Sequence, residues 1–262
     1  RRFLKYSEEL YEEGYITLGT APFLDFKSMV KAAPQLVKLQ SWRTLYSKVA
    51  TFIEDEHLRQ AFSFHTLLVG GNPFATSAVY GLIHALEREG GVWFAKGGTG
   101  ALVAGLVRLF ETIGGTVRLS APVALLTTAR DQATGVRLSS GEVIEADLVA
   151  SNADIMHTYK SLLGESPRGH EEARRLAKKR YSNSLFVVYF GLDREVPNDL
   201  EHHVILFGPR YRELIGEIFK GPELPTDFSL YLHAPSKTDA SLAPPGQSAY
   251  YVLAPVPHLG AA

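Results

Sequence analysis

The spacing of the apolar residues changes partway along the chain, and this change constrains the fold more than any other feature. From Phe26 to Arg88 apolar side chains recur every three or four residues, which predicts helices. Beyond Gly115 apolar and polar residues alternate, which predicts strands. A helical block set between strand-rich segments predicts an α+β or mixed fold, in which the chain passes between domains.

Several helix boundaries can be predicted within the helical block. Asp55 is expected to cap a helix, and its apolar side is expected to carry Leu58, Ala61, Phe62, His65 and Leu68. Ser77 is expected to start a further helix that ends at Gly90-Gly91. An earlier apolar stripe is formed by Trp42, Leu45, Tyr46, Val49, Phe52 and Ile53.

The stretch KGGTGALVAGLVRLFETIGGTVRLSAPV, Lys96 to Val123, resembles a nucleotide-binding loop at first sight. A dinucleotide fingerprint needs a third glycine, but that position holds Val103, and no Gly-Lys-Ser/Thr follows for a phosphate loop. The segment instead predicts a helix capped by Thr99 and ended by Gly114-Gly115, followed by a strand.

The rest of the chain predicts strands and helices in an order typical of an antiparallel sheet. Residues 116–129 and 134–154 are expected to form strands with a turn at Ser139-Ser140-Gly141. Helices are expected near 153–163 and 169–179. Four later strand-like runs are NSLFVVYFGL, HHVILFG, DFSLYLHAP and SAYYVLAPV, with a helix in PRYRELIGEIFKG.

The composition excludes several classes of protein and of site. A formal net charge of -1 gives no basic field for nucleic acid, so no nucleic-acid partner is expected. The absence of cysteine excludes disulfides and thiolate metal sites. No apolar run reaches the length of a membrane span. Because Arg1 already lies in a helix-like run, we expect an internal piece of a longer protein.

The histidines do not predict a metal site. His202 and His203 are adjacent, and neighbouring residues on a strand point to opposite faces, so both are not expected to bind one ion. No HExxH pattern is present, and no Gly-x-Ser-x-Gly elbow indicates a serine hydrolase.

Five stretches resemble one family over essentially the whole chain: IEDEHLRQAFSFHTLLVGGNPF, ALEREGGVWFAKGGTGALVAGLVRLFETIGGTVRLSAPV, VASNAD, FGPRYRELIGEIF and YYVLAPVPHLG. They are similar to bacterial phytoene desaturases, FAD-dependent enzymes of carotenoid biosynthesis with a flavin amine-oxidase-like fold. Two alternatives stay open: another flavin oxidoreductase of this fold, such as a carotenoid isomerase-like enzyme or an amine oxidase, and a non-catalytic lipid-binding module.

The resemblance implies an organisation in three regions. Residues 1–96 would form a mainly helical, substrate- and membrane-facing region. Residues 97–152 would return the chain to the FAD-binding domain, and residues 153–262 would form a substrate domain with an antiparallel sheet. The family's amino-terminal glycine fingerprint and its carboxy-terminal flavin segment have no counterpart in this sequence.

The resemblance also implies roles for individual residues. Val123, Gly97, Gly98 and Asn152 would contact FAD, with Val123 reading the adenine through its backbone. Phe64, His65 and Leu68 would contact the substrate. Asp25 is the candidate catalytic carboxylate, although the family position three residues further on holds Ser28 here. Each has a structural alternative: a strand valine for Val123, a core histidine for His65, and a helix cap for Asp25.

The implied reaction removes hydrogen across carbon–carbon bonds of phytoene on the way to lycopene. A long apolar carotenoid has no polar handle, so an apolar tunnel is expected to bind it. Such a substrate dissolves in lipid, which implies peripheral attachment to the cytoplasmic side of the cell membrane. The basic run Ala173–Arg180 would contact headgroups there, or would form an ordinary solvated helix face.

Overall fold

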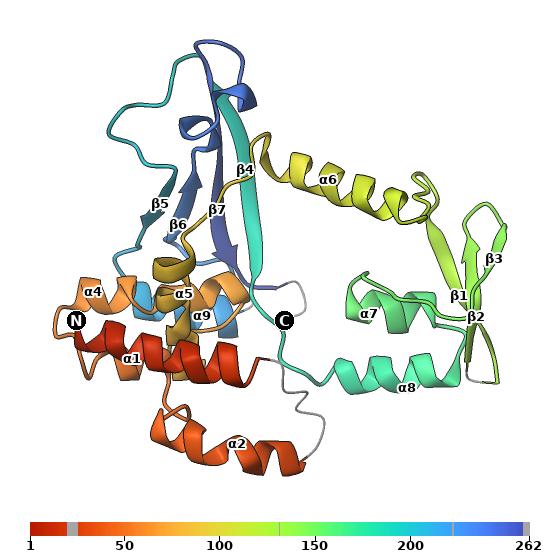
Figure 1. Cartoon of the computed structure of the whole chain (residues 1–262), viewed down its shortest axis with the longest axis horizontal. Coiled ribbons are helices and arrows are strands. Elements are labelled where there is room, and N and C mark those ends of the chain that lie inside the picture. Colours follow the sequence, from red (N-terminus) through yellow and green to blue (C-terminus); the bar gives the residue numbers. More distant parts are fainter. Residues whose placement is uncertain (20–25, 131, 222, 259–262) are drawn as a thin grey trace. The chain divides into compact units, whose positions relative to one another are not determined.

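The computed structural model describes residues 1–19, 26–130, 132–221 and 223–258 of the chain (Figure 1). The chain forms two compact units. Unit 1 comprises Arg1–Leu102 and Ser182–Ala262, and unit 2 comprises Val103–Tyr181. Each unit is described below by itself.

Unit 1 begins with short helices. They are α1 (Arg2–Tyr11), the π-helix η1 (Glu12–Thr17), α2 (Phe26–Lys38), α3 (Leu45–Val49), α4 (Glu56–Ala61), the 3-10 helices η2 (Phe64–Val69) and η3 (Ala78–Leu82), and α5 (Ile83–Gly90). Asp55 caps α4 as predicted, since its Oδ1 accepts a hydrogen bond of 2.8 Å from the Leu58 amide. Ser77 caps η3, and α5 ends at Gly90 as predicted.

The core of these helices forms around α1. Its buried members are Phe3, Tyr6, Leu10, Leu39, Leu45 and Val49. Buried Ser7 joins α1 to the later helices, because its hydroxyl donates to the Gly81 carbonyl at 2.6 Å and accepts from the Ala85 amide at 2.9 Å. These contacts satisfy polar atoms that would otherwise be costly to bury.

The second half of unit 1 is a four-stranded sheet, visible in Figure 1 as the blue and teal arrows, of which β4 and β7 are the long ones. Its strands are β4 (Ser184–Leu192), β5 (His203–Leu206), β6 (Leu230–His233) and β7 (Ser248–Val256). The order β4-β7-β6-β5 and the antiparallel pairing confirm the predicted sheet. Helix α9 (Tyr211–Lys220) buries Leu214 and Ile215 in a second core that includes Phe74 of the helical block.

The short helices η5 (Pro235–Lys237) and η6 (Ala240–Leu242) follow β6. Helix α6 (Gly98–Thr112) carries the chain from unit 1 into unit 2. Thr99 therefore lies inside α6, so its predicted role as the cap is wrong. The helix begins at Gly98, two residues earlier than a cap at Thr99 would place its start, and Gly97 and Gly98 have positive φ values of +81° and +74° there. Gly114, at φ +94°, follows the helix end as predicted.

The described residues of unit 2 contain the remainder of α6, a three-stranded meander and three further helical segments. The strands are β1 (Val123–Ala129), β2 (Gln132–Leu138) and β3 (Val143–Glu145), and the helices are α7 (Ile155–His157), the π-helix η4 (Thr158–Leu162) and α8 (Pro167–Leu176). The turn after β2 is confirmed, with Gly141 at φ +91°. The predicted strand runs 116–129 and 134–154 are too long at their ends, because residues 116–122 and 146–154 lie in no strand.

The structure corrects one further part of the helical pattern. The helix that Asp55 caps ends at Ala61, so it does not extend to Leu68. Leu58 and Leu68 are 49% and 66% exposed, and Trp42 is 67% exposed. Leu58 and Leu68 have the spacing of one helical stripe but lie in two separate helices, α4 and η2, and Trp42 lies before α3 begins, so the spacing does not place them on one buried face.

The predicted mixed α and β architecture is confirmed. The predicted division at residues 96 and 152 stays a prediction about the domains of a longer flavoprotein. Among the described residues, no helix is both long and apolar enough to cross a membrane.

Candidate functional site

One face of the sheet in unit 1 carries a row of ring side chains. His203 of β5 pairs with His233 of β6, His233 pairs with Tyr251 of β7, and Tyr251 pairs with Tyr189 of β4. Directly paired residues point to the same face of a sheet. The register therefore places these four rings in one row across the four strands, which we call the ring row.

The rings of the ring row contact one another. His203 and His233 are stacked, with centroids 5.4 Å apart and planes 7° apart. His233 and Tyr251 meet edge to face at 4.5 Å. Tyr231, two residues before His233 on β6, donates to or accepts from His203 Nδ1 at 2.6 Å. The row is thus an aromatic surface that also presents ring nitrogens.

His202 joins the row from the chain segment before β5. Its ring centroid lies 4.3 Å from that of His203, and its Nε2 lies 2.6 Å from His233 Nε2. The expectation that adjacent His202 and His203 point apart is wrong. It assumed that both residues are on the strand, whereas β5 begins at His203. Phe94 packs edge-on against His202, with centroids 4.8 Å apart.

These histidines are held in their neutral forms. Burial, together with the neighbouring His202 and His203, lowers the pKa of His233 to about 4. Burial is also the main cause of the lowered pKa values of His202 and His203. Near neutral pH the cluster therefore offers nitrogen lone pairs rather than positive charges.

The predicted substrate residues Phe64 and His65 lie at the start of η2. His65 is buried, and its Nε2 lies 3.4 Å from Glu87 Oε2. The His65 ring meets that of His84 edge to face at 4.3 Å, and burial lowers the pKa of each to about 4. His65 Nδ1 is buried without a hydrogen-bond partner in the described structure.

Phe64 packs against His65 and, at 5.7 Å between centroids, against Phe207. Leu68, the third predicted substrate residue, is 66% exposed at the far end of η2. Phe64 and His65 are thus brought together, while Leu68 is turned to the surface. The proposed substrate contacts of all three residues stay predictions.

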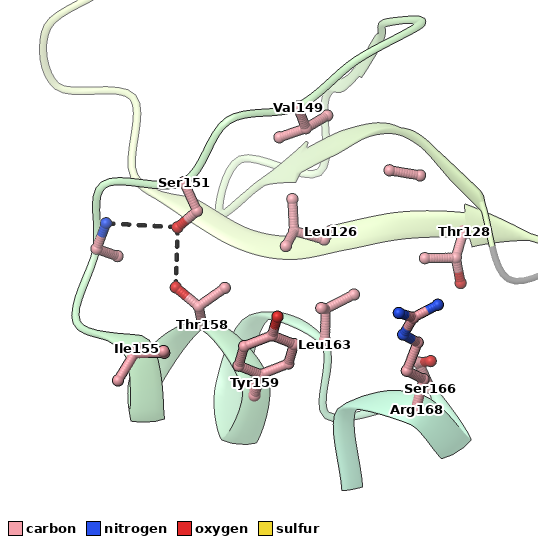
Figure 2. A pocket seen from close by; sticks show the side chains of 12 residues that line it. Leu126, Thr128, Val149, Ser151, Ile155, Thr158, Tyr159, Leu163, Ser166 and Arg168 are labelled. Atoms are coloured by element: carbon pink, nitrogen blue, oxygen red, sulfur yellow. Dashed lines mark hydrogen bonds between the residues drawn. The ribbon is translucent and has the colours of Figure 1, made fainter. Parts of the chain in front are cut away.

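Unit 2 has a pocket of about 520 Å³ between the meander and the helices that follow it (Figure 2). Leu126 and Val149 lie above it, and Tyr159 and Arg168 come from the helices below. Ser151 hydrogen-bonds to Thr158 at 2.8 Å and accepts from the Ala153 amide, which fixes one end of the pocket. The volume lies within the roughly 300–1,000 Å³ of small-molecule sites.

The predicted cofactor residues Val123 and Asn152 are both in unit 2. Asn152 is exposed and sits between the pocket-lining Ser151 and Ala153. Val123 is 37% exposed at the start of β1. It pairs with Leu138, but the next pair joins Leu125 to Arg137, so the ladder skips Ala124. A residue skipped in this way has backbone groups that the ladder does not pair.

Gly97 and Gly98, the other predicted cofactor residues, are in unit 1. The Gly97 amide already donates to Asp239 Oδ2 at 2.6 Å, and this bond helps to lower the pKa of Asp239. Gly98 is buried at the start of α6, where an added Cβ would meet Leu242 at 3.5 Å. Asp25, the candidate catalytic residue, lies outside the described residues.

The ring row was missed at the level of sequence. The signal was present, because HHVILFG and SLYLHAP each carry a histidine in alternating strand sequence. The register that pairs His203 with His233 depends on residues thirty positions apart, and no local pattern specifies it.

Comparison with known proteins gives consistent matches along the whole chain. The sequence profile of the family described as flavin containing amine oxidoreductase matches residues 3–257. The chain is 62% identical over 262 residues to the lycopene-forming phytoene desaturase of Paracoccus sp. (strain N81106 / MBIC 01143), covering 100% of this chain and 52% of that protein.

Two further relatives differ in the product that their names give. The chain is 60% identical over 262 residues to the lycopene-forming phytoene desaturase of Pantoea ananas, covering 100% of this chain and 53% of that protein. It is 41% identical over 260 residues to the neurosporene-forming phytoene desaturase of Cereibacter sphaeroides, covering 98% of this chain and 50% of that protein. The chain thus spans about half the length of the curated relatives it matches.

Among solved structures, an oxidoreductase from Methanosarcina mazei matches with a TM-score of 0.62 at 19% identity, covering 89% of this chain and 53% of that one. A likeness at this identity supports the fold alone. The profile match over residues 3–257, together with these relatives, shows that the chain belongs to the flavin containing amine oxidoreductase family.

Proposed function

We propose that the protein containing this chain is an FAD-dependent desaturase that converts phytoene toward lycopene. The observation that carries this proposal is the 62% identity, along the whole chain, to a lycopene-forming phytoene desaturase. The identity to a neurosporene-forming enzyme is lower, 41%, which favours lycopene as the product.

The surface around the ring row supports an apolar substrate. Tyr189 and Phe186 of β4 are 77% and 64% exposed, so the sheet presents large apolar area on both of its faces. A carotenoid offers neither charge nor hydrogen-bonding groups, and its binding free energy comes from buried apolar area at about 25 cal/mol per Å². Neutral histidines suit such a surface better than charged ones, because a buried charge without a partner is costly.

The residues of unit 2 fit part of a flavin nucleotide. The skipped position after Val123 leaves backbone groups for the edge of a base, and the pocket beside Ser151 and Asn152 is lined by apolar side chains with a few polar groups among them. FAD, when bound, supplies a hydride acceptor for the removal of hydrogen from a saturated bond. The chain's own residues would orient the polyene, exclude water and hold the base edge.

In unit 1, the role proposed for Gly97 and Gly98 is a close backbone approach. Gly97 at φ +81° and Gly98 at φ +74° allow a turn that residues with a Cβ rarely adopt. The Gly97 amide is already engaged by Asp239, so the proposed contact is made through shape rather than through this donor.

We also propose that the protein attaches peripherally to the cytoplasmic side of the cell membrane. Tyr15, Ile16 and Trp42 of the helical block are each more than half exposed, and the basic run continues past the end of α8. Apolar side chains and lysines or arginines together bind anionic lipid surfaces. High salt should release the protein from membranes; retention through both high-salt and alkaline washing would contradict peripheral attachment.

The activity is tested with the full-length protein, reconstituted with FAD and incubated with phytoene in liposomes. We expect polyenes of increasing length, ending in lycopene, when the extracts are separated and their visible absorption is recorded. Omission of FAD is the control and should abolish the products. A folded, flavin-loaded protein that leaves phytoene unchanged, or that instead oxidises amines, would overturn the proposal.

A further inference from the structure

We propose that His202, His203 and His233 form a binding site for a divalent transition-metal ion of the zinc type. The site goes beyond the proposed desaturation and does not depend on it. It also departs from the expectation, drawn from the sequence, that no metal is bound.

The three imidazoles converge. One ring nitrogen from each residue lies within 4.8 Å of those of the other two, and the His202 and His233 Nε2 atoms are 2.6 Å apart. With Zn–N bonds of about 2.0–2.1 Å, ligand nitrogens in a tetrahedral site are about 3.3–3.4 Å apart. The 2.6 Å separation lies below that value and the 4.8 Å limit lies above it, so the three nitrogens are gathered near the spacing of ligands around one ion.

Groups around the cluster hold two of the rings by their other nitrogen. Thr238 Oγ1 bonds to His202 Nδ1, and Tyr231 OH lies 2.6 Å from His203 Nδ1. Metal-binding histidines characteristically donate their second ring N–H to such a group, which fixes the tautomer that leaves the opposite nitrogen free for the ion. The rings of His202 and His203 are therefore already held in place by a second group, as the rings of metal-binding histidines are.

His233 supplies the strongest sign of an unmet partner. It is 8% exposed, its Nδ1 has no hydrogen-bond partner in the described structure, and its Nε2 faces only the nitrogen of another imidazole. Two neutral imidazole nitrogens in contact can share at most one proton between them. A cation bound by the two Nε2 atoms replaces this nitrogen–nitrogen contact with two metal–nitrogen bonds.

The site also has an entrance and a free coordination position. His203 is exposed while His233 is buried, so the cluster opens to solvent on one side. Phe94 and Tyr251 form apolar walls against His202 and His233. Three histidines with an open fourth position are a coordination set used by zinc sites that bind water or a substrate oxygen.

A second cluster, His65, His84 and Glu87, is a weaker candidate and serves as an internal comparison. His84 Nε2 is already engaged by the Phe62 carbonyl at 3.0 Å, and His65 Nε2 by Glu87. One nitrogen of each histidine is thus engaged, although His65 Nδ1 has no partner, and no member of this cluster is exposed, whereas His203 opens the first cluster to solvent.

The test is equilibrium dialysis of the metal-free, tag-free protein containing this chain against Zn²⁺, with metal content measured per chain. We expect one Zn²⁺ per chain. The same protein with Co²⁺ should show the intense visible absorption of a four-coordinate ion. His203→Asn and His233→Asn should each weaken Zn²⁺ binding about 100-fold or more, and Tyr231→Phe about 10-fold, because it removes only the group that orients His203.

His57→Asn, in exposed α4, is the matched control and should leave Zn²⁺ binding unchanged. Circular dichroism and thermal melting establish that each variant is folded; His203 is exposed, so its variant serves if His233→Asn unfolds. The proposal is overturned if no stoichiometric Zn²⁺ binds, if the folded His203 variant binds normally, or if His65→Asn abolishes binding while His203→Asn does not.

Discussion

Unit 1 and unit 2 bury their apolar side chains to very different extents. Both core clusters are in unit 1, one around α1 and one around α9. In the described part of unit 2 the buried large apolar side chains are Leu138 and Leu162, whereas Leu119 and Leu148 are 85% and 80% exposed. The relatives that the chain matches are about twice as long as the chain.

The comparison teaches that the two units depend on different sources of stability. Unit 1 is stabilised mainly by buried apolar area and by bonds such as those of Ser7. Unit 2 is held by backbone pairing, by turns with glycine and by exposed ion pairs such as Arg118–Glu142. Substitutions that remove apolar volume should therefore be costly in unit 1, and substitutions that strain the backbone should be costly in unit 2.

The largest effect is expected from removing core volume in unit 1. Leu214→Ala in α9 removes a side chain with no exposed area, and we expect the free energy of unfolding to fall by about 2–5 kcal/mol. Leu119→Ala in unit 2 is the matched control and should change it by less than about 0.5 kcal/mol. Urea denaturation measures the free energy of unfolding of both variants. Equal losses would contradict the proposed difference between the two units.

Backbone strain should dominate in unit 2. Gly135 of β2 has φ +151°, and an added Cβ would lie 2.1 Å from the Ile144 carbonyl oxygen of β3. Gly135→Ala should therefore destabilise the meander by roughly 2–3 kcal/mol. Gly141 also has a positive φ, but an added Cβ would have nothing within 4 Å. We therefore expect Gly141→Ala to lower the free energy of unfolding by only about 1 kcal/mol. Hydrogen exchange of the β2 and β3 amides distinguishes the two variants.

Acid should weaken unit 1 through its buried histidines. The pKa of His65 is lowered by burial from 6.5 to about 4, so between these values the unfolded chain binds more protons than the folded one. The free energy of unfolding should then fall as the pH falls from about 6.5 to about 4, by about 1–3 kcal/mol for this residue.

His65→Asn should flatten this part of the pH dependence, whereas His57→Asn, at an exposed position, should leave it unchanged. Denaturation at several pH values measures the slope. A slope unaffected by His65→Asn would show that other groups cause the acid sensitivity.

The smallest effect in this order concerns cofactor binding by unit 2. If the start of β1 reads adenine through its backbone, Val123→Pro in the full-length protein should weaken FAD binding about tenfold or more, since proline removes the amide donor. Val123→Ile should leave FAD binding unchanged apart from a small packing cost. Flavin titration with a parallel melting curve measures this, and normal affinity in a folded proline variant would make Val123 an ordinary strand residue.

The sequence by itself determined what local chemistry controls. Asp55 caps α4 because an aspartate before a helix accepts an amide bond from its first turn, and Gly141 forms the turn after β2 because glycine tolerates positive φ. The alternation in the last four strand-like runs was enough to predict an antiparallel sheet, and the motifs shared with the desaturases pointed to the family.

Only the tertiary structure decided where those elements begin and which side chains meet. Leu68 has the spacing of a helical stripe but is exposed, because α4 ends at Ala61. His202 and His203 meet because β5 begins between them, and His233 joins them through the register of β5 and β6. Strand register and chain reversal depend on contacts between residues far apart in sequence, and a pattern read along a few neighbours contains no information about them.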